Sequence, residues 1–310
     1  MTGSGPAPAA RVVVLGSINR DHTVTVHQRP EAGETVLAES LHVSSGGKGA
    51  NQAIAAAVEG APTFFIGAVG DDPAGQALLD DLVAAGVDTS AVAVIPDTPS
   101  GAAFVTVTPD GQNTIIVASS ANARLDLKMA ARAAVDLLAV PGSVLVLQAE
   151  LSPAVVDTAA AAAAQIGARV VLNQAPYRPL HEDTLRWCDP LIVNTGEAAG
   201  LVGRPIATVA DSSSAAAELA RRCRSVVLTL GELGAVVTAD GQTTHLPALP
   251  ADVVDTVGAG DAFTGAVAAR LAAGVSVLDA ARTGVAAAAA TVAHRGAQPP
   301  GPPANEPLNP

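Results

Sequence analysis

Residues Asp255-Thr256-Val257-Gly258-Ala259-Gly260-Asp261 lead directly into an alanine-rich run over 262–271. The small residues allow a tight turn, and the helix predicted to follow directs its first free N–H groups back into that turn. Such a concavity binds an anion and can stabilise negative charge that develops on a phosphoryl group during transfer. This stretch therefore predicts a phosphate-binding turn at the start of a helix.

Asp261 falls in the first turn of that predicted helix. A helix-capping aspartate, worth about 1 kcal/mol of helix stability, is the ordinary explanation. A cap does not need Gly-Ala-Gly before it, however, and a carboxylate inside an anion-binding turn is electrostatically unfavourable unless it has a function. We therefore expect Asp261 to accept a proton from an attacking hydroxyl group.

A second glycine-rich stretch, Gly46-Gly47-Lys48-Gly49-Ala50-Asn51, follows a predicted strand and opens a predicted helix over 49–59. Glycines let the backbone approach a ligand closely, and a helix N-terminus offers free N–H donors. The residue order differs from that of a Walker A loop and from G-x-G-x-x-G. From this segment alone, an ordinary glycine turn with a surface lysine remains an open alternative.

Two polar pairs follow predicted strands. Asn19 and Asp21 are two residues apart in an extended segment, so they point to one side and could hold neighbouring hydroxyl groups; an Asx turn is the alternative.

Asn194 and Glu197 follow a buried strand at the end where α/β sheets place ligands. They could orient metal-bound water near a phosphate, or form a capping box at the start of a helix.

The order of elements predicts an α/β fold. Strands and helices alternate after residue 125, which is typical of a mostly parallel sheet with helices on both faces. The predicted strands of this sheet are 11–16, 63–69, 144–147, 170–172, 191–193 and 226–229. The predicted helices are 73–85, 127–138, 153–165, 212–222 and those that follow Gly258 and Asp279. A hairpin is predicted over 235–246. Strand-like runs within 21–44 and 101–118 predict a small antiparallel sheet that forms a lid beside the glycine-rich site.

The length of 310 residues and the apolar content fit a single α/β domain. We expect it over 11–298, with 1–10 and 299–310 as flexible termini. The net charge of −12 disfavours nucleic-acid binding, because phosphates would be repelled. We see neither a signal peptide nor an apolar run long enough to span a membrane, so we expect a cytoplasmic protein without membrane contacts. Cys188 and Cys223 lack the spacing of a metal or redox site.

From Val12 to Gln298 the chain resembles the ribokinase (PfkB) family of carbohydrate and nucleoside kinases. One pattern begins at Gly46 and runs through Gly60 to Gly70; the other is 255–261 followed by Gly265-Ala266. The resemblance implies a ribokinase-like three-layer sandwich with a mostly parallel central sheet and a small antiparallel β lid. It also implies transfer of a phosphoryl group from ATP to a sugar.

The resemblance also assigns site residues. Asp261 would be the catalytic base and Gly258, Ala259 and Gly260 the anion hole. The groups that hold the sugar hydroxyls would be Asn19, Asp21, Gly47, Lys48, Asn51 and Glu150. The nucleotide and its Mg²⁺ would be bound by Asn194, Glu197, Thr229, Gly231 and Gly260, and a K⁺ loop would include Asp255, Val257 and Gly296.

The opening Gly-Ser-Ile-Asn and the first glycine-rich stretch are most similar to family members that phosphorylate D-ribose. We therefore expect ATP-dependent phosphorylation of the primary 5-hydroxyl of D-ribose, which gives ribose 5-phosphate and ADP. A kinase of the family for deoxyribose, fructose or a nucleoside is one alternative, and a sugar-binding sensor without turnover is another. An exposed edge of the lid also predicts pairing with a second copy into a homodimer.

Two departures from the family pattern bear on the nucleotide end. Pro300 stands where relatives often place a serine near the monovalent cation. The run Val285–Thr291 is nearly all alanine where relatives often have Asn or His near the adenine. We therefore expect mostly apolar contacts with the base.

Overall fold

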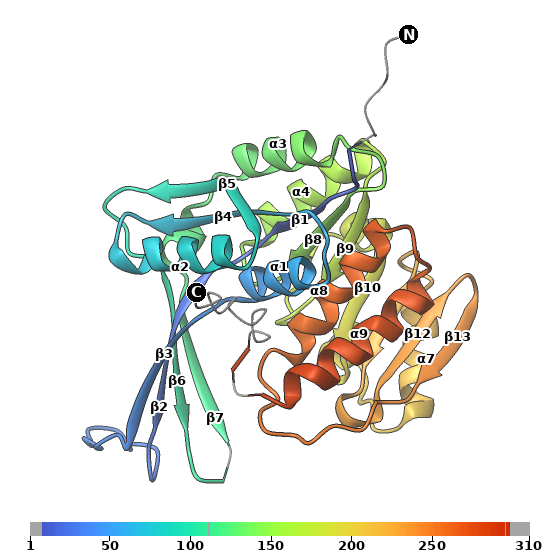
Figure 1. Ribbon diagram of the computed structural model, residues 1–310. Coiled ribbons are helices and arrows are strands. Elements are labelled where there is room, and N and C mark those ends of the chain that lie inside the picture. The colour runs from blue at the N-terminus through green and yellow to red at the C-terminus, as the bar shows by residue number, and fades with distance from the viewer. Residues whose placement is uncertain (1–7, 111, 295, 298–310) are drawn as a thin grey trace, which may run out of the picture.

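The computed structural model describes residues 8–110, 112–294 and 296–297. These residues form one large sheet covered by helices and a second, smaller sheet that projects from its side (Figure 1). Residues 8–10 are irregular, whereas the rest of the two expected termini, and Pro300, lie outside the described residues.

The large sheet has nine strands in the order β13-β12-β11-β10-β9-β8-β1-β4-β5. Neighbours from β11 to β5 pair in parallel, and β12 and β13 add an antiparallel edge. The strands are β1 (Val12–Leu15), β4 (Thr63–Gly70), β5 (Val87–Ile95), β8 (Val144–Gln148), β9 (Arg169–Asn173), β10 (Cys188–Asn194), β11 (Val226–Thr229), β12 (Ala235–Ala239) and β13 (Gln242–Leu246). The predicted mostly parallel sheet is confirmed.

Helices cover both faces of this sheet, which makes three layers. Val13 and Leu15 of β1 pack into one apolar cluster, whereas Val12 and Val14 pack into the other, as alternation along a strand requires. One face carries α3 (Leu127–Leu138), α4 (Pro153–Gln165), α5 (Glu182–Trp187), α6 (Thr195–Val202) and α7 (Val209–Leu219). The other carries α1 (Lys48–Val58), α2 (Pro73–Ala84), α8 (Ala259–Ala272) and α9 (Val277–Val292).

The small sheet has the order β3-β2-β6-β7 and is the predicted lid. Its strands are β2 (Asn19–Thr25), β3 (Ser40–Gly46), β6 (Gly101–Val107) and β7 (Asn113–Ala118). The β2–β3 and β6–β7 pairs are antiparallel as expected, but the central strands β2 and β6 run parallel. Both leave the large sheet outward, β2 after β1 and β6 after β5, so they share one direction.

Within the lid segment predicted over 21–44, residues 26–39 form no strand. Glu34 N–H donates to the carbonyl of Glu31, and the Glu34 carboxylate accepts from Glu31 N–H, so this part forms a turn. The strand begins only at Ser40. Local side-chain hydrogen bonds of this kind compete with strand pairing. Among the described helices, none combines the length and apolar character needed to cross a membrane.

Candidate active site

The site forms where helices α1 and α8 meet. A Cβ added to Gly265 of α8 would lie 2.5 Å from the Cβ of Ala55 and 2.5 Å from the carbonyl oxygen of Gln52 in α1. Only glycine therefore permits this close approach of the two helices. The approach brings the first turn of α8 beside the first turns of α1, and so joins the two glycine-rich stretches of the sequence.

Asp261 lies at this junction and is 7% exposed. One carboxylate oxygen, Oδ1, accepts a hydrogen bond of 2.9 Å from Nε2 of Gln52, and Oδ2 accepts one of 3.1 Å from Nδ2 of Asn51. The N-cap of α8 is Gly258, without a side-chain cap hydrogen bond. The capping explanation for Asp261 is therefore wrong, because this carboxylate accepts from side chains of another helix.

The turn before α8 has the shape that an anion requires. Gly258 has a φ of 81°, a left-handed conformation that favours glycine. A Cβ on Gly258 would lie 2.3 Å from the carbonyl oxygen of Ala297, so the segment after α9 packs behind the turn. A Cβ on Gly260 would meet no atom within 4 Å. The space in front of Ala259 and Gly260 is thus open to a ligand.

Lys48 occupies the first turn of α1, after Gly47 with its φ of 89°. The negative charge of Asp261 is the main cause of a raised pKa for Lys48; burial opposes it, and Glu150 and Glu197 add to it. The Lys48 N–H donates to Oε2 of Glu150 at 3.1 Å, and the Ser17 hydroxyl donates to the same oxygen. The structure therefore gathers Lys48, Glu150 and Asp261, as the sequence predicted, and adds Ser17.

Asn19 and Asp21 lie at the base of the lid, in β2. Oδ1 of Asn19 accepts a 2.9 Å hydrogen bond from Nδ2 of Asn122, a buried residue that the sequence analysis missed. Asn122 also bonds both backbone groups of Ile18, so it holds the start of β2. Sequence offered no signal for it beyond an Asn near a predicted lid strand.

The Asp21 carboxylate is electrostatically unusual. Burial, and next the negative charge of Glu150, raise its pKa to about 7, while Arg20 opposes the rise and Asp261 contributes to it. Oδ1 of Asp21 and Oδ1 of Asn51 are buried without a hydrogen-bond partner among the described residues. An unpaired buried acceptor costs about 1–3 kcal/mol, which hydroxyl donors of a ligand would recover.

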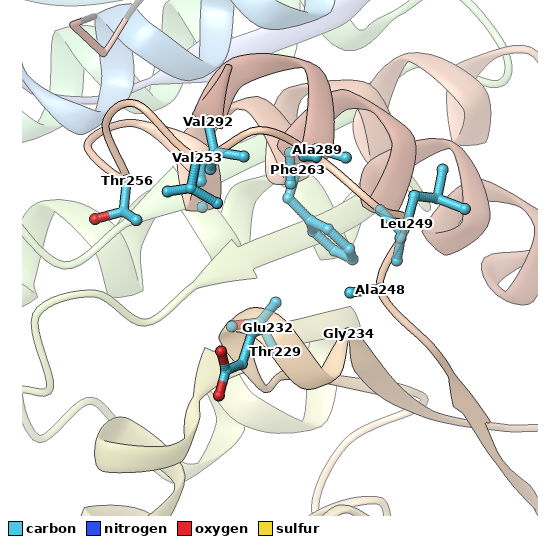
Figure 2. A pocket seen from close by; sticks show the side chains of 16 residues that line it. Thr229, Glu232, Gly234, Ala248, Leu249, Val253, Thr256, Phe263, Ala289 and Val292 are labelled. Carbon is cyan, nitrogen blue, oxygen red and sulfur yellow. The ribbon is translucent and has the colours of Figure 1, made fainter. Parts of the chain in front are cut away.

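A pocket of about 590 Å³ lies on the other side of the first turn of α8. Its walls include Thr229, Gly231, Ala259 and Gly260, which the sequence analysis had assigned to nucleotide or phosphate. Figure 2 shows the ring of Phe263 pointing into this pocket. Most of the remaining wall is apolar, and the residues missed by sequence include Phe263, Leu249, Val253, Ala248, Ala251 and Val292. A flat apolar group such as a nucleotide base fits such a wall.

Asn194 and Glu197 form a reciprocal capping box at the start of α6. Oδ1 of Asn194 accepts from Glu197 N–H, and Oε2 of Glu197 accepts from Asn194 N–H, both at 2.8 Å. The capping alternative is therefore confirmed. Burial raises the pKa of Glu197, and the Asn194 N–H and Lys48 oppose the rise. The same carboxylate thus caps a helix and contributes charge to the site.

Asp255 joins the two segments expected to surround a monovalent cation. Oδ1 accepts from Val257 N–H and Oδ2 from Gly296 N–H, both at 3.0 Å. The structure therefore brings Asp255, Val257 and Gly296 together. The carboxylate is engaged with backbone N–H groups, and no group of three or more His, Cys, Asp or Glu suited to a metal ion occurs among the described residues.

Comparison with known proteins agrees with this architecture. The profile of the pfkB family carbohydrate kinases matches residues 9–305. Ribokinase of Bacillus subtilis is 36% identical over 287 residues, which cover 93% of this chain and 94% of the relative. Deoxyribokinase of Salmonella typhimurium is 35% identical over 259 residues, which cover 83% of this chain and 84% of the relative.

The solved structure of Arabidopsis thaliana ribokinase complexed with ribose and ATP superimposes with a TM-score of 0.87 at 32% identity, over 94% of this chain and 96% of that one. The two glycine-rich turns, the carboxylate between them and the projecting lid occur within the region that these matches cover. The chain therefore belongs to the pfkB family of carbohydrate kinases.

Proposed function

We propose that this protein transfers the γ-phosphoryl group of ATP to the primary 5-hydroxyl of D-ribose, and so forms ribose 5-phosphate and ADP. The observation that carries the proposal is the position of Asp261. Its helix lines the apolar pocket through Gly260 and Phe263, while its carboxylate bonds Asn51 beside the lid. A base in this position would lie between a nucleotide in the apolar pocket and a sugar under the lid.

The chemistry follows from the surroundings of that carboxylate. Two amide N–H donors leave Asp261 a hydrogen-bond acceptor, so it can take the proton of the attacking hydroxyl. The open turn at 258–260 and the ammonium of Lys48 would stabilise charge on the transferred group. Phosphoryl transfer depends mainly on such positioning and electrostatics. We propose that residues 11–298 form the single kinase domain that carries this activity.

Ribose is the sugar that the polar groups favour. Asn19, Asp21, Asn51 and Glu150 offer hydrogen-bonding side chains, and none of the six assigned sugar residues is aromatic, so none of these six offers a nucleoside base a stacking surface. Unpaired acceptors on Asp21 and Asn51 would penalise an analogue that lacks a hydroxyl group. A deoxyribose kinase is the second candidate, because a deoxyribokinase is as similar to this chain as several ribokinases.

The test is a comparison of kcat/KM on ribose, 2-deoxyribose, fructose and adenosine, with product quantified directly. We expect ribose to be best, with 2-deoxyribose lower by at least about 10-fold, the loss typical of one hydrogen bond to a polar site. A higher efficiency on any of the other three would contradict ribose as substrate and leave the family unaffected. Absence of turnover on all four would favour a sensor.

Two cations complete the proposal. Mg²⁺ bound with ATP would share the negative charge of the ATP phosphates. Glu197 is suited to contact this ion, because a nearby cation favours the ionised form of its carboxylate, which burial disfavours.

K⁺ would fit beside the turn at 258–260, held by the backbone carbonyl oxygens of Val257 and Gly296, because the side chains of these two residues offer no ligand atom. Asp255 would shape this loop through its two N–H hydrogen bonds.

We also propose a homodimer through the lid, in the cytoplasm, with no nucleic acid or membrane as partner. Register places Val43, His22, Phe104 and Ile116 in one row across the four lid strands. His22 and Phe104 stack with ring centroids 5.4 Å apart. Phe104 is 50% and Ile116 66% exposed. A second copy of the lid would cover this apolar row.

A further inference from the structure

Three buried amide side chains form a hydrogen-bonded relay behind Asp261. They come from three elements: Gln52 from α1, Gln148 from β8 and Asn173 from β9. Gln52, which is 0% exposed, occupies the centre of the relay. Its Nε2 donates to Oδ1 of Asn173 at 3.0 Å and to Oδ1 of Asp261 at 2.9 Å, and its Oε1 accepts from Nε2 of Gln148 at 2.7 Å. All hydrogen-bonding capacity of the Gln52 amide nitrogen is therefore used.

A backbone carbonyl sets the direction of every donor in this relay. The carbonyl oxygen of Ile192 can only accept, so the group of Asn173 that faces it at 3.2 Å must be the NH₂ group. The oxygen of Asn173 then faces Gln52 and must accept. Nε2 of Gln52 must consequently lie at that end, and its second N–H points at Asp261. No member can turn over without placing two donors or two acceptors together.

This polarity has a consequence for Asp261. A proton on its Oδ1 would oppose the Gln52 N–H, so the relay keeps Oδ1 a hydrogen-bond acceptor, while Nδ2 of Asn51 donates to Oδ2. We propose that Gln52, oriented by Asn173 and Gln148, is a positioning residue that fixes the rotamer of Asp261 and keeps it able to accept a proton. The proposal rests on the proposed function, in which Asp261 is the base. The other charged groups that act on this carboxylate are Lys48, Asp21 and Glu197.

The decisive variant is Gln52→Glu, which keeps the shape of the side chain but replaces the NH₂ donor by a carboxylate. Two adjacent carboxylates cannot both ionise readily, so one proton will be held between them. We expect kcat at pH 7 to fall at least about 10-fold, below the full contribution of a base. The acidic limb of the kcat/KM profile should move to higher pH, with partial recovery of activity at alkaline pH. The sugar KM should change little.

Gln174 provides the matched control. It is a buried amide at 1% exposure that follows Asn173, but its side-chain Nε2 donates to the carbonyl of Arg178 and not to a member of the relay. Only its backbone N–H shares the Ile192 carbonyl with Asn173, and a side-chain substitution leaves that bond in place. Gln174→Met should lower the melting temperature and leave the pH profile unchanged. Gln52→Met, which removes the donor without adding charge, keeps the test available if Gln52→Glu does not fold. It should lower kcat with the sugar KM retained.

Asp261→Asn, measured in parallel, separates this proposal from the proposed function. If Asp261→Asn is inactive while a folded Gln52→Glu or Gln52→Met keeps the wild-type kcat and pH profile, the relay has no positioning role. Equal shifts of the pH profile in the Gln52 and Gln174 variants would also overturn it. Near-normal turnover of Asp261→Asn would instead overturn Asp261 as the base, whatever the Gln52 variants do.

Discussion

The carboxylate of Asp21 lies against the backbone of Gly46, which pairs with Asn19 across the β2–β3 ladder at the base of the lid. A Cβ placed on Gly46 would come within 2.0 Å of Oδ2 of Asp21. No real side chain tolerates that distance, so glycine at this position is what allows the carboxylate to occupy the side of the lid where we propose that the sugar binds.

Gly46→Ala should therefore displace Asp21. We expect the KM for ribose to rise about 10-fold or more, because leaving a buried polar group without its partner costs about 1–3 kcal/mol. The value of kcat should fall less, since Asp261 belongs to α8 and not to the lid strands. Ser40→Ala, which removes a 3.1 Å hydrogen bond to Thr25 at the far end of the same strand, is the control. An unchanged ribose KM in Gly46→Ala would show that Asp21 does not hold the sugar.

Asp21 should make stability depend on pH. Its pKa is raised from 3.8 to about 7 in the folded protein, so its protonated form is favoured by folding. Its contribution to the free energy of unfolding is complete below about pH 4 and is lost as pH rises through about 7. The melting temperature should fall from pH 5 to pH 8 more in the wild type than in Asp21→Asn. Parallel curves for the two proteins would refute the raised pKa.

Asp261→Asn should abolish most turnover. A positioned base contributes at least about 10²-fold, and the amide cannot take the proton of the sugar hydroxyl. Folding and ribose binding should be largely retained, which thermal unfolding with and without ribose will show. Near-normal turnover in a folded variant would exclude Asp261 as the base. A lower melting temperature with full turnover would point to a purely structural role.

A monovalent cation should increase the kcat of the phosphoryl transfer. The loop that contains Val257 and Gly258 is tied to Gly296 through Asp255, so an ion there would shape the anion turn. Replacing K⁺ by tetramethylammonium at constant ionic strength should lower kcat several-fold. Product should be measured by chromatography, so that no coupling enzyme responds to the cation. Equal rates in both salts would show that this loop needs no ion.

The lid should dimerise the protein. Light scattering is expected to give about twice the mass of 30.5 kDa of one chain. Ile116→Glu places a charge in the apolar row and should produce monomers, because burying an unpaired carboxylate is strongly unfavourable. Met129→Glu, an equally exposed apolar position on α3, should leave the mass unchanged. A fully active wild-type monomer at micromolar concentration would rule out the proposed dimer.

Local features of the molecule could be predicted from sequence alone. The helices over 127–138 and 153–165 and the strand over 226–229 have the predicted bounds. Asp126 and Ser152 cap the two helices, and a β-branched run forms the strand. These signals lie within a few residues of one another, so they favour the same local structure whatever the tertiary contacts of the segment are. The strand β5 and the helix α5 were missed, because short or half-exposed elements lack such a signal, whereas the capping box of Asn194 and Glu197 had offered the start of α6 as an alternative.

Sequence by itself thus determined the two glycine-rich turns and the candidate base, since each depends on neighbouring residues, and it indicated a mostly parallel sheet through the alternation of strands and helices along the chain. Only the tertiary structure decided which side chains meet Asp261. Asn51 and Gln52, which bond it, are 210 and 209 positions away in sequence, and Gln148 and Asn173 orient Gln52 from two strands. The same holds for the parallel pairing of β2 with β6. Such contacts depend on strand order, register and the close approach of α1 to α8, which no local pattern of residues specifies.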